Sequence, residues 1–213
     1  QSETVSTSVE VVAGSPPVLS ISNLPGTKYN AGGGFVSVLG TVSSTLGYTS
    51  MWSIDSSDVT SPFFVKSAPT PTVANKLSAV LDLSAFTVGN SYTIRLSATD
   101  SAGVSSFTTI SLTMNEAPGS GAVAVTPSKG VALSTPFSFA ALGWVDEDLP
   151  LSFRFGTVPV NDDLSLNLDS AAPFGDVRSS AFMDGVALPS SAHALNYTVG
   201  CFSEAVDTFG ASG

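Results

Sequence analysis

Few residues of this chain could bind a metal ion or catalyse a reaction, and most of these candidates are carboxylates. Asp146-Glu-Asp148 is the densest acidic run, and Asn161-Asp-Asp163 could add further carboxylates. Such loops can bind Ca²⁺, which takes about six to eight oxygen ligands. Neither run has EF-hand spacing, and Asp is common in turns because its side chain bonds the backbone. Asp146, Glu147 and Asp148 are therefore calcium candidates, with a plain turn as the favoured interpretation, and no other cofactor is expected.

Catalytic groups are sparse in this sequence. His193 is the only histidine and Cys201 the only cysteine. No nucleophile elbow, phosphate-binding loop or zinc-ligand spacing accompanies them. Cys201 lies in a strand-like run without a basic neighbour, which favours a buried apolar side chain over a reactive thiol. The sequence predicts that the protein is not an enzyme.

Two segments could carry sugars. Asn196-Tyr-Thr198 is the only N-glycosylation sequon, so Asn196 is an N-linked candidate. The segment Ala68-Pro-Thr-Pro-Thr72 is rich in Pro and Thr, which makes Thr70 and Thr72 O-linked candidates. Covalent glycans are therefore expected partners of an extracellular protein.

Composition limits what else the chain could bind. Its net charge is −10, with 17 acidic and 7 basic residues, which argues against nucleic acid and anionic membrane surfaces. No run of about 18 apolar residues is present, so no membrane span is expected. With 213 residues and 43% hydrophobic residues, the chain can form two sandwich domains of about 100 residues each.

Alternating apolar and polar residues, punctuated by Gly, Pro, Asn and Asp, predict strands throughout and no helix of usable length. The breaks at Ala13–Pro17 and Asn115–Gly121 divide the chain into an N-terminal strand (residues 1–14), a first domain (15–116) and a second domain (117–213). The expected strands are Val18–Ser22, Phe35–Ser43, Tyr48–Ile54, Leu77–Leu83, Tyr92–Ala98, Phe107–Met114, Ala122–Thr126, Phe137–Leu142, Leu151–Phe155, Leu164–Leu168, Phe182–Leu188 and Tyr197–Val206.

Four aromatic residues are candidate core anchors. Trp52 lies within an expected strand, where a core tryptophan packs between sheets, and Trp144 is the corresponding candidate in the second domain. Tyr92 opens a late strand, where its hydroxyl can tie back to a preceding turn, and Tyr197 occupies a comparable place. The fold class expected is all-β, with two tandem immunoglobulin- or fibronectin-III-like β-sandwiches.

The two domains share an ending, but the second stops early. Ala98-Thr-Asp-Ser-Ala-Gly103 is followed by the strand-like run Phe107–Met114. Ala205-Val-Asp-Thr-Phe-Gly210 is followed only by Ala-Ser-Gly213. The second sandwich is therefore expected to lack its last strand in cis, which would expose unpaired backbone and an apolar slot.

The N-terminal segment could supply that strand. Val5, Thr7, Val9 and Val11 lie on one face of an extended segment that a Pro-Pro break follows. We expect residues 2–12 to complete the second domain of a neighbouring copy, either between separate chains or within one long repetitive chain. The alternative is a disordered N-terminal tail and a truncated C-terminus.

A family resemblance supports an extracellular role. The runs Val125-Thr-Pro-Ser-Lys-Gly-Val-Ala-Leu133 and Gly143-Trp-Val-Asp-Glu-Asp-Leu-Pro-Leu151 resemble the REJ (receptor for egg jelly) module of polycystin-1-type ectodomains and of protist and algal surface proteins. The resemblance implies extracellular sandwiches used in adhesion, mechanical linkage or ciliary-surface structures. It also implies a cysteine pair flanking the first hairpin, at positions that Val123 and Ala141 hold here.

These observations favour a structural subunit of an extracellular, glycosylated filament or surface appendage, which joins to other copies of itself head-to-tail. The alternative function is an adhesion or receptor ectodomain fragment that binds protein or glycan through its loops.

Overall fold

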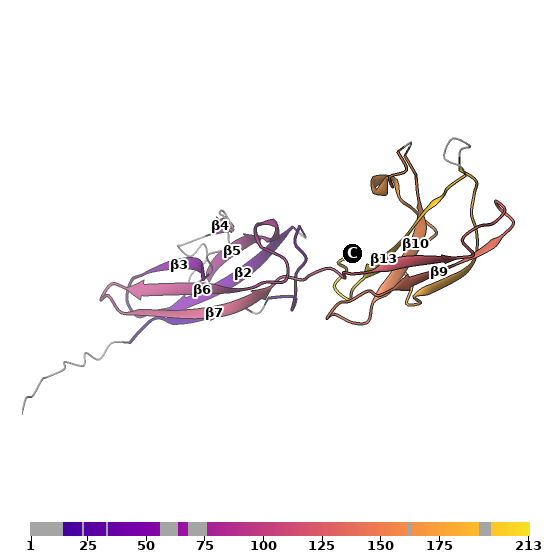
Figure 1. Cartoon of the computed structure of the whole chain (residues 1–213). Helices are drawn as coiled ribbons and strands as arrows, with labels where there is room; N and C mark the ends of the chain where they lie inside the picture. The colour runs from indigo at the N-terminus through magenta and orange to yellow at the C-terminus, as the bar shows by residue number, and fades with distance from the viewer. Residues whose placement is uncertain are drawn as a thin grey trace, which may run out of the picture. The chain divides into compact units, whose positions relative to one another are not determined.

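The computed structural model is an all-β chain that divides into two compact units, Gln1–Met114 and Asn115–Gly213 (Figure 1). The structure describes residues 15–22, 24–32, 34–55, 64–67, 76–161, 163–191 and 197–213. These ranges contain no α-helix, and two short 3₁₀ turns interrupt the strands, η1 (Leu83–Ala85) and η2 (Leu168–Ser170).

Unit 1 holds two antiparallel sheets. One has the order β1-β2-β5-β4 and the other the order β3-β6-β7. The chain neighbours β1 and β2, β4 and β5, and β6 and β7 pair within a sheet. After β2, β3 and β5 the chain crosses to the other sheet, as in a Greek-key sandwich. The strands are β1 (Val18–Ile21), β2 (Phe35–Ser43), β3 (Tyr48–Asp55), β4 (Phe64–Ser67), β5 (Lys76–Asp82), β6 (Ser91–Asp100) and β7 (Ser105–Thr113).

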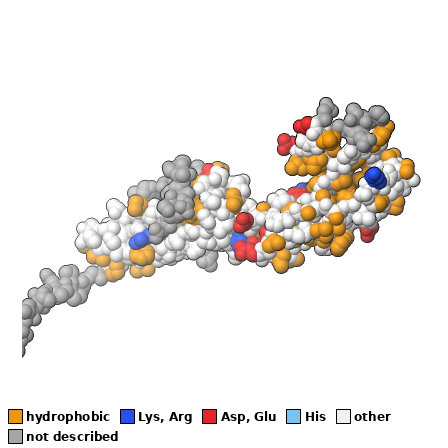
Figure 2. Space-filling view, in the orientation of Figure 1, with side chains coloured by type: hydrophobic (Ala, Val, Ile, Leu, Met, Phe, Trp, Pro, Cys, Tyr) orange, Lys and Arg blue, Asp and Glu red, His pale blue; other side chains and the backbone are white. Residues whose placement is uncertain are grey.

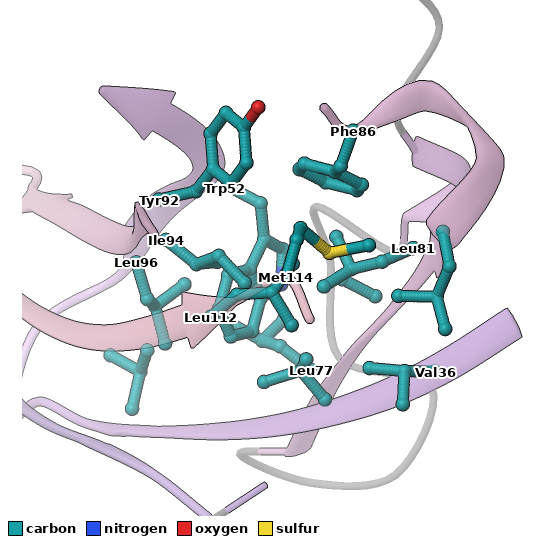
Figure 3. Packing of buried hydrophobic residues seen from close by; sticks show 14 of the residues in the cluster. Val36, Trp52, Leu77, Leu81, Phe86, Tyr92, Ile94, Leu96, Leu112 and Met114 are labelled. Atoms are coloured by element: carbon teal, nitrogen blue, oxygen red, sulfur yellow. The ribbon is translucent and has the colours of Figure 1, made fainter. Parts of the chain in front are cut away.

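Strict alternation of side chains builds the core of unit 1. Every second residue of β6 from Tyr92 to Asp100 is buried, because successive side chains of a strand point to opposite faces. Val36 and Val38 of β2 and Leu112 of β7 are buried in the same cluster. Figure 3 shows side chains of both sheets packed together in this cluster, among them Val36 of β2, Ile94 of β6 and Leu112 of β7. The period of two in the sequence is thus the physical origin of this core.

Unit 2 also holds two sheets, with the orders β12-β9-β8 and β11-β10-β13. Its buried cluster contains Phe139 of one sheet and Phe155 of the other, with ring centroids 6.0 Å apart in an edge-to-face arrangement. The strands are β8 (Ala122–Thr126), β9 (Pro136–Leu142), β10 (Ser152–Val158), β11 (Ala172–Pro173), β12 (Phe182–Ala187) and β13 (Gly200–Val206).

One predicted strand is wrong. Leu164–Leu168 alternates like a strand, but it forms a turn and a single bridge between Val160 and Leu166. The side chain of Asp163 accepts hydrogen bonds from the backbone N–H and the hydroxyl of Ser165, and Leu164 has a positive φ of 67°. An aspartate turn therefore replaces the strand. The strands β4 and β11 are short, and no sequence pattern predicted them.

The surface carries little charge, as expected from the 11% of charged residues. Figure 2 shows mostly white and orange surface with scattered red and blue side chains. Along the described part of the chain, we find no helix with the length and apolar character needed to cross a bilayer.

Candidate functional site

The outer edge of β13 is the feature that distinguishes unit 2 from unit 1. One side of β13 pairs with β10 over its whole length, from Ser152↔Val206 to Val158↔Gly200. On the other side, the described residues supply only a bridge from Ser212 to Val206 and a bond from Gly213 N–H to the Ala205 carbonyl. Antiparallel bonds alternate in direction, so the backbone groups of Ser203 and Cys201 point to this outer edge.

Unit 1 shows what occupies the same edge in a paired sheet. There β6 pairs with β3 on one side and with β7 on the other, from Ser91↔Thr113 to Thr99↔Ser105. The partly buried Ile110 and the buried Leu112 of β7 close that side of the core. Strand β7 thus both satisfies the backbone of β6 and covers the core.

The turns that follow β6 and β13 match bond for bond. Asp100 Oδ1 accepts the backbone N–H groups of Ala102 and Val104, each at 2.9 Å. Asp207 Oδ1 accepts those of Phe209 and Ala211, at 2.8 and 2.9 Å. Gly103 and Gly210 then take positive φ values of 84° and 81°. Both aspartates are 6% exposed. The matched turns make β13 the counterpart of β6, and Ser212 the counterpart of Ser105.

A slot of about 930 Å³, lined by both apolar and polar residues, opens beside the start of β13. It lies between the sheets, with β8 and β9 on one side and the chain before β13 on the other. Its apolar lining includes Val123, Val125, Phe137, Leu188, Val199 and Cys201. Lys129 and Tyr197 also line it. In unit 1 the corresponding side of the core is closed by β7.

Cys201 faces this slot and is partly buried. Burial raises the pKa of its thiol, because a low-polarity environment disfavours the thiolate. The side chain contributes to the apolar lining of the slot and packs against the unit 2 cluster.

Val123 and Ala141 face each other directly across β8 and β9. These are the residues expected at the positions of the family's cysteine pair. Ala141 is 8% exposed and belongs to the buried cluster, and Val123 packs against it. Apolar contact therefore joins the two strands at this place.

Three carboxylates gather at one end of unit 2. Side-chain oxygens of Asp146, Asp148 and Asp207 all lie within 4.8 Å of one another. Asp146 Oδ1 accepts the backbone N–H of Asp148 at 2.6 Å, and Asp207 Oδ2 accepts Asn115 Nδ2 at 2.6 Å. Glu147, the third calcium candidate, is not part of this group. Sequence reasoning missed Asp207, because about 60 residues separate it from the acidic run.

The four core candidates have different environments. Trp52 and Tyr92 lie in the unit 1 core, 7% and 2% exposed, and Tyr92 Oη accepts the backbone N–H of Thr87. Trp144 is partly buried against the unit 2 cluster. Tyr197 is 58% exposed and has a positive φ of 59°, so the expectation that it packs in the core is wrong. The matched turns show the reason, since Val199 rather than Tyr197 is the counterpart of Tyr92.

Several sequence candidates lie outside the described residues. They are the assembly-strand candidates Val5, Thr7, Val9 and Val11, the sugar candidates Thr70, Thr72 and Asn196, and the single histidine His193. Their assignments stay predictions.

Two sheets facing each other across an apolar core in each unit define a module of the β-sandwich class. The family model of the REJ domain matches residues 1–212, so this chain belongs to the REJ domain family. No curated protein matches the chain.

Two solved structures are distantly similar to this chain. The chicken CNTN1 FN1-FN3 domains are 13% identical at a TM-score of 0.33, and the match covers 92% of this chain and 65% of that one. Dimeric latent PorU from Porphyromonas gingivalis is 15% identical at a TM-score of 0.29, with coverage of 93% and 19%. This chain therefore spans less than two thirds of either protein.

Proposed function

We propose that this protein is a structural subunit of an extracellular filament or surface appendage, rather than an enzyme. Its copies join head-to-tail when residues 2–12 of one copy add to the outer edge of β13 in the next. Unit 2 is then a sandwich that lacks its last strand in cis. Glycans attached to the chain protect the fibre surface.

The open edge of β13 is the observation that carries this proposal. Its counterpart β6 has a partner strand, and the turn that would lead into such a partner is already formed after β13. An added strand would satisfy the outward backbone groups of Ser203 and Cys201 and close the apolar slot.

Residues 2–12 fit that edge by their pattern. Val5, Thr7, Val9 and Val11 form one apolar face with period two, and polar residues lie between them. This is the pattern of a strand with one buried face. Strand addition joins two different surfaces, so it continues from copy to copy and produces filaments unless it closes into a ring.

Deletion of residues 1–14 tests the proposal. The full chain should form regular fibres or rings in negative-stain images, whereas the deleted chain should stay monomeric. Added to assembling full chain, the deleted chain should shorten the fibres, because it accepts a strand but donates none. A deleted chain that polymerises like the full chain would refute the proposal. Dispersed full-length monomers that bind protein or glycan would instead support the adhesion-module alternative.

A further inference from the structure

The pairing of β13 with β10 shows which side chains of β13 face the core of unit 2. Ser203 lies directly opposite Phe155, and Ala205 lies opposite Phe153. Phe155 is 2% exposed in the unit 2 cluster, so Ser203 also faces the core. Cys201 lies two residues further along the same face and lines the slot. A strand added to this edge would place three residues opposite Ser203, Cys201 and Val199.

Ser203 has an unsatisfied hydroxyl. Its Oγ is buried and has no hydrogen-bond partner within the described residues. Its counterpart in unit 1 is Leu96, which lies opposite Thr108 of β7. A buried hydroxyl without a partner is unfavourable, because it has lost its water without a replacement. The open edge therefore carries one polar group that a suitable incoming side chain could satisfy.

Among the described residues, Ser and Thr hydroxyls bond each other across paired strands at three other places, all of them exposed. Ser20 and Thr41 lie directly opposite each other with hydroxyl oxygens 2.7 Å apart. The pairs Ser91–Thr113 and Thr99–Ser105 have oxygens 3.0 and 2.8 Å apart. Cross-strand hydroxyl pairs of this kind stabilise a particular alignment of two strands.

Part of the N-terminal segment has the same apolar pattern as β7. Residues Thr108–Met114 read Thr-Thr-Ile-Ser-Leu-Thr-Met, and residues Thr7–Ala13 read Thr-Ser-Val-Glu-Val-Val-Ala. Both begin with Thr and place apolar residues at every second position after it, and a proline follows each segment within four residues, at Pro118 and at Pro16-Pro17. Aligned in this way, Ser6 takes the place of Phe107, the residue that follows the counterpart of Gly213.

We propose that residues Thr7–Ala13 add to β13 in a single register, with Thr7 opposite Ser203, Val9 opposite Cys201 and Val11 opposite Val199. This inference rests on the proposed strand addition and assigns the residues that fix its alignment. The Thr7 and Ser203 hydroxyls bond each other, and the two valines fill the slot.

Neighbouring registers are less favourable. A one-residue slip turns the valines outward and buries Glu10. A two-residue slip in either direction keeps the valines inward but places Val5 or Val9 opposite Ser203. Thr7 is the only hydroxyl residue among the odd positions from Val5 to Val11, so among the registers that keep Val9 and Val11 inward, only this one gives Ser203 a hydroxyl partner.

Disulfide cross-linking to Cys201, the only cysteine of the chain, can measure this register directly. Directly opposite residues that exchange backbone bonds have Cα atoms about 5.5 Å apart, within disulfide range, whereas diagonal neighbours lie at about 7–8 Å. Peptides of residues 2–17 with an activated cysteine in place of Thr7, Val9 or Val11 are added to the chain lacking residues 1–14. The Val9→Cys peptide should cross-link to Cys201 at least about tenfold faster than the other two.

Each outcome separates the register from the strand addition itself. A fastest reaction with the Thr7→Cys or Val11→Cys peptide would overturn the register and leave strand addition standing. Cross-linking no faster than with a scrambled peptide would overturn both. Addition of excess unmodified peptide must suppress the reaction, because otherwise it is a surface encounter.

A second measurement tests the hydroxyl pair. The Thr7→Val peptide should bind the deleted chain on the order of tenfold more weakly than the parent peptide. Against the Ser203→Ala chain, the two peptides should bind alike. The matched control carries Thr7→Val with Val9→Thr, which keeps the composition and moves the hydroxyl by two residues. Equal binding of all three peptides to the unchanged chain would exclude a role for Thr7 in setting the register.

Discussion

At the scale of single residues, the two units differ at the corner that precedes β6 in unit 1 and β13 in unit 2. The hydroxyl of Tyr92 ties the start of β6 to the preceding turn through the backbone N–H of Thr87, at 2.9 Å. Its ring packs edge-on against Phe86, with centroids 4.9 Å apart. Unit 2 has Val199 at the counterpart position, which lines the open slot. The corner that closes unit 1 is therefore part of the accessible surface of unit 2.

The Tyr92→Phe substitution should destabilise unit 1 by about 1 kcal/mol, because it removes one hydrogen bond and keeps the packing. Urea denaturation followed by Trp52 fluorescence in a Trp144→Phe background measures this unit alone. The control is Tyr48→Phe, since Tyr48 Oη is buried without a partner among the described residues and its loss should be neutral or favourable. Equal losses for both variants would contradict the role given to the Tyr92 hydroxyl.

Cys201 gives unit 2 a pH-dependent reactivity. Burial raises the pKa of its thiol, so the thiolate forms at higher pH in the folded chain than in the unfolded one. The midpoint of the pH–rate curve for alkylation should therefore lie at higher pH for the folded chain in buffer than for the chain unfolded in urea. By linkage, the same shift removes stability from unit 2 as pH rises past the ordinary thiol range. Coincident pH–rate curves in the folded and unfolded chain would show that burial does not control this thiol.

At the scale of elements, close packing between the sheets of unit 1 depends on a glycine in β2. A Cβ built at Gly40 would lie 2.5 Å from Leu96 Cδ2 and 2.9 Å from Trp52 Cζ2. The indole of Trp52 therefore packs against bare backbone. Trp52 can lie between the sheets because β2 carries no side chain at this point.

The Gly40→Ala substitution should destabilise unit 1 by about 1–3 kcal/mol, since the core must shift to admit one methyl group. Thermal and urea denaturation should both detect the loss. Gly47→Ala is the matched control, because a Cβ there meets nothing within 4 Å. If Gly40→Ala proves as stable as the control, the two sheets are less tightly packed at Trp52 than described.

Sequence periodicity predicts most elements here for a physical reason. A half-buried strand must alternate, and β2 and β6 do so without interruption. The same rule fails at Leu164–Leu168, where the Asp163 side chain and the positive φ of Leu164 favour a turn. It also fails at Tyr197, where alternation says nothing about backbone angle. The carboxylate group was only half predicted, because Asp207 joins Asp146 and Asp148 through the fold.

At the scale of the whole molecule, one strand would separate a filament subunit from a closed monomer. In the proposed register, Ser6 follows Gly213 as Phe107 follows Ser106 in unit 1. The strand can therefore be returned to its own chain without a linker. Deleting residues 1–14 and joining residues 6–17 directly to Gly213 should give a self-complemented protein.

This rearranged chain should stay monomeric, and its unit 2 should melt about 5 °C or more above unit 2 of the chain lacking residues 1–14. The gain arises because the strand supplies apolar burial and backbone bonds without the entropy cost of association. Calorimetry and analytical ultracentrifugation measure both properties. The sharpest control inserts one glycine between Gly213 and Ser6, since a one-residue slip turns Val9 and Val11 outward and Glu10 inward. If this control is stabilised as much as the direct fusion, tethering alone explains the gain, and the edge of β13 does not select the inward face of the N-terminal segment.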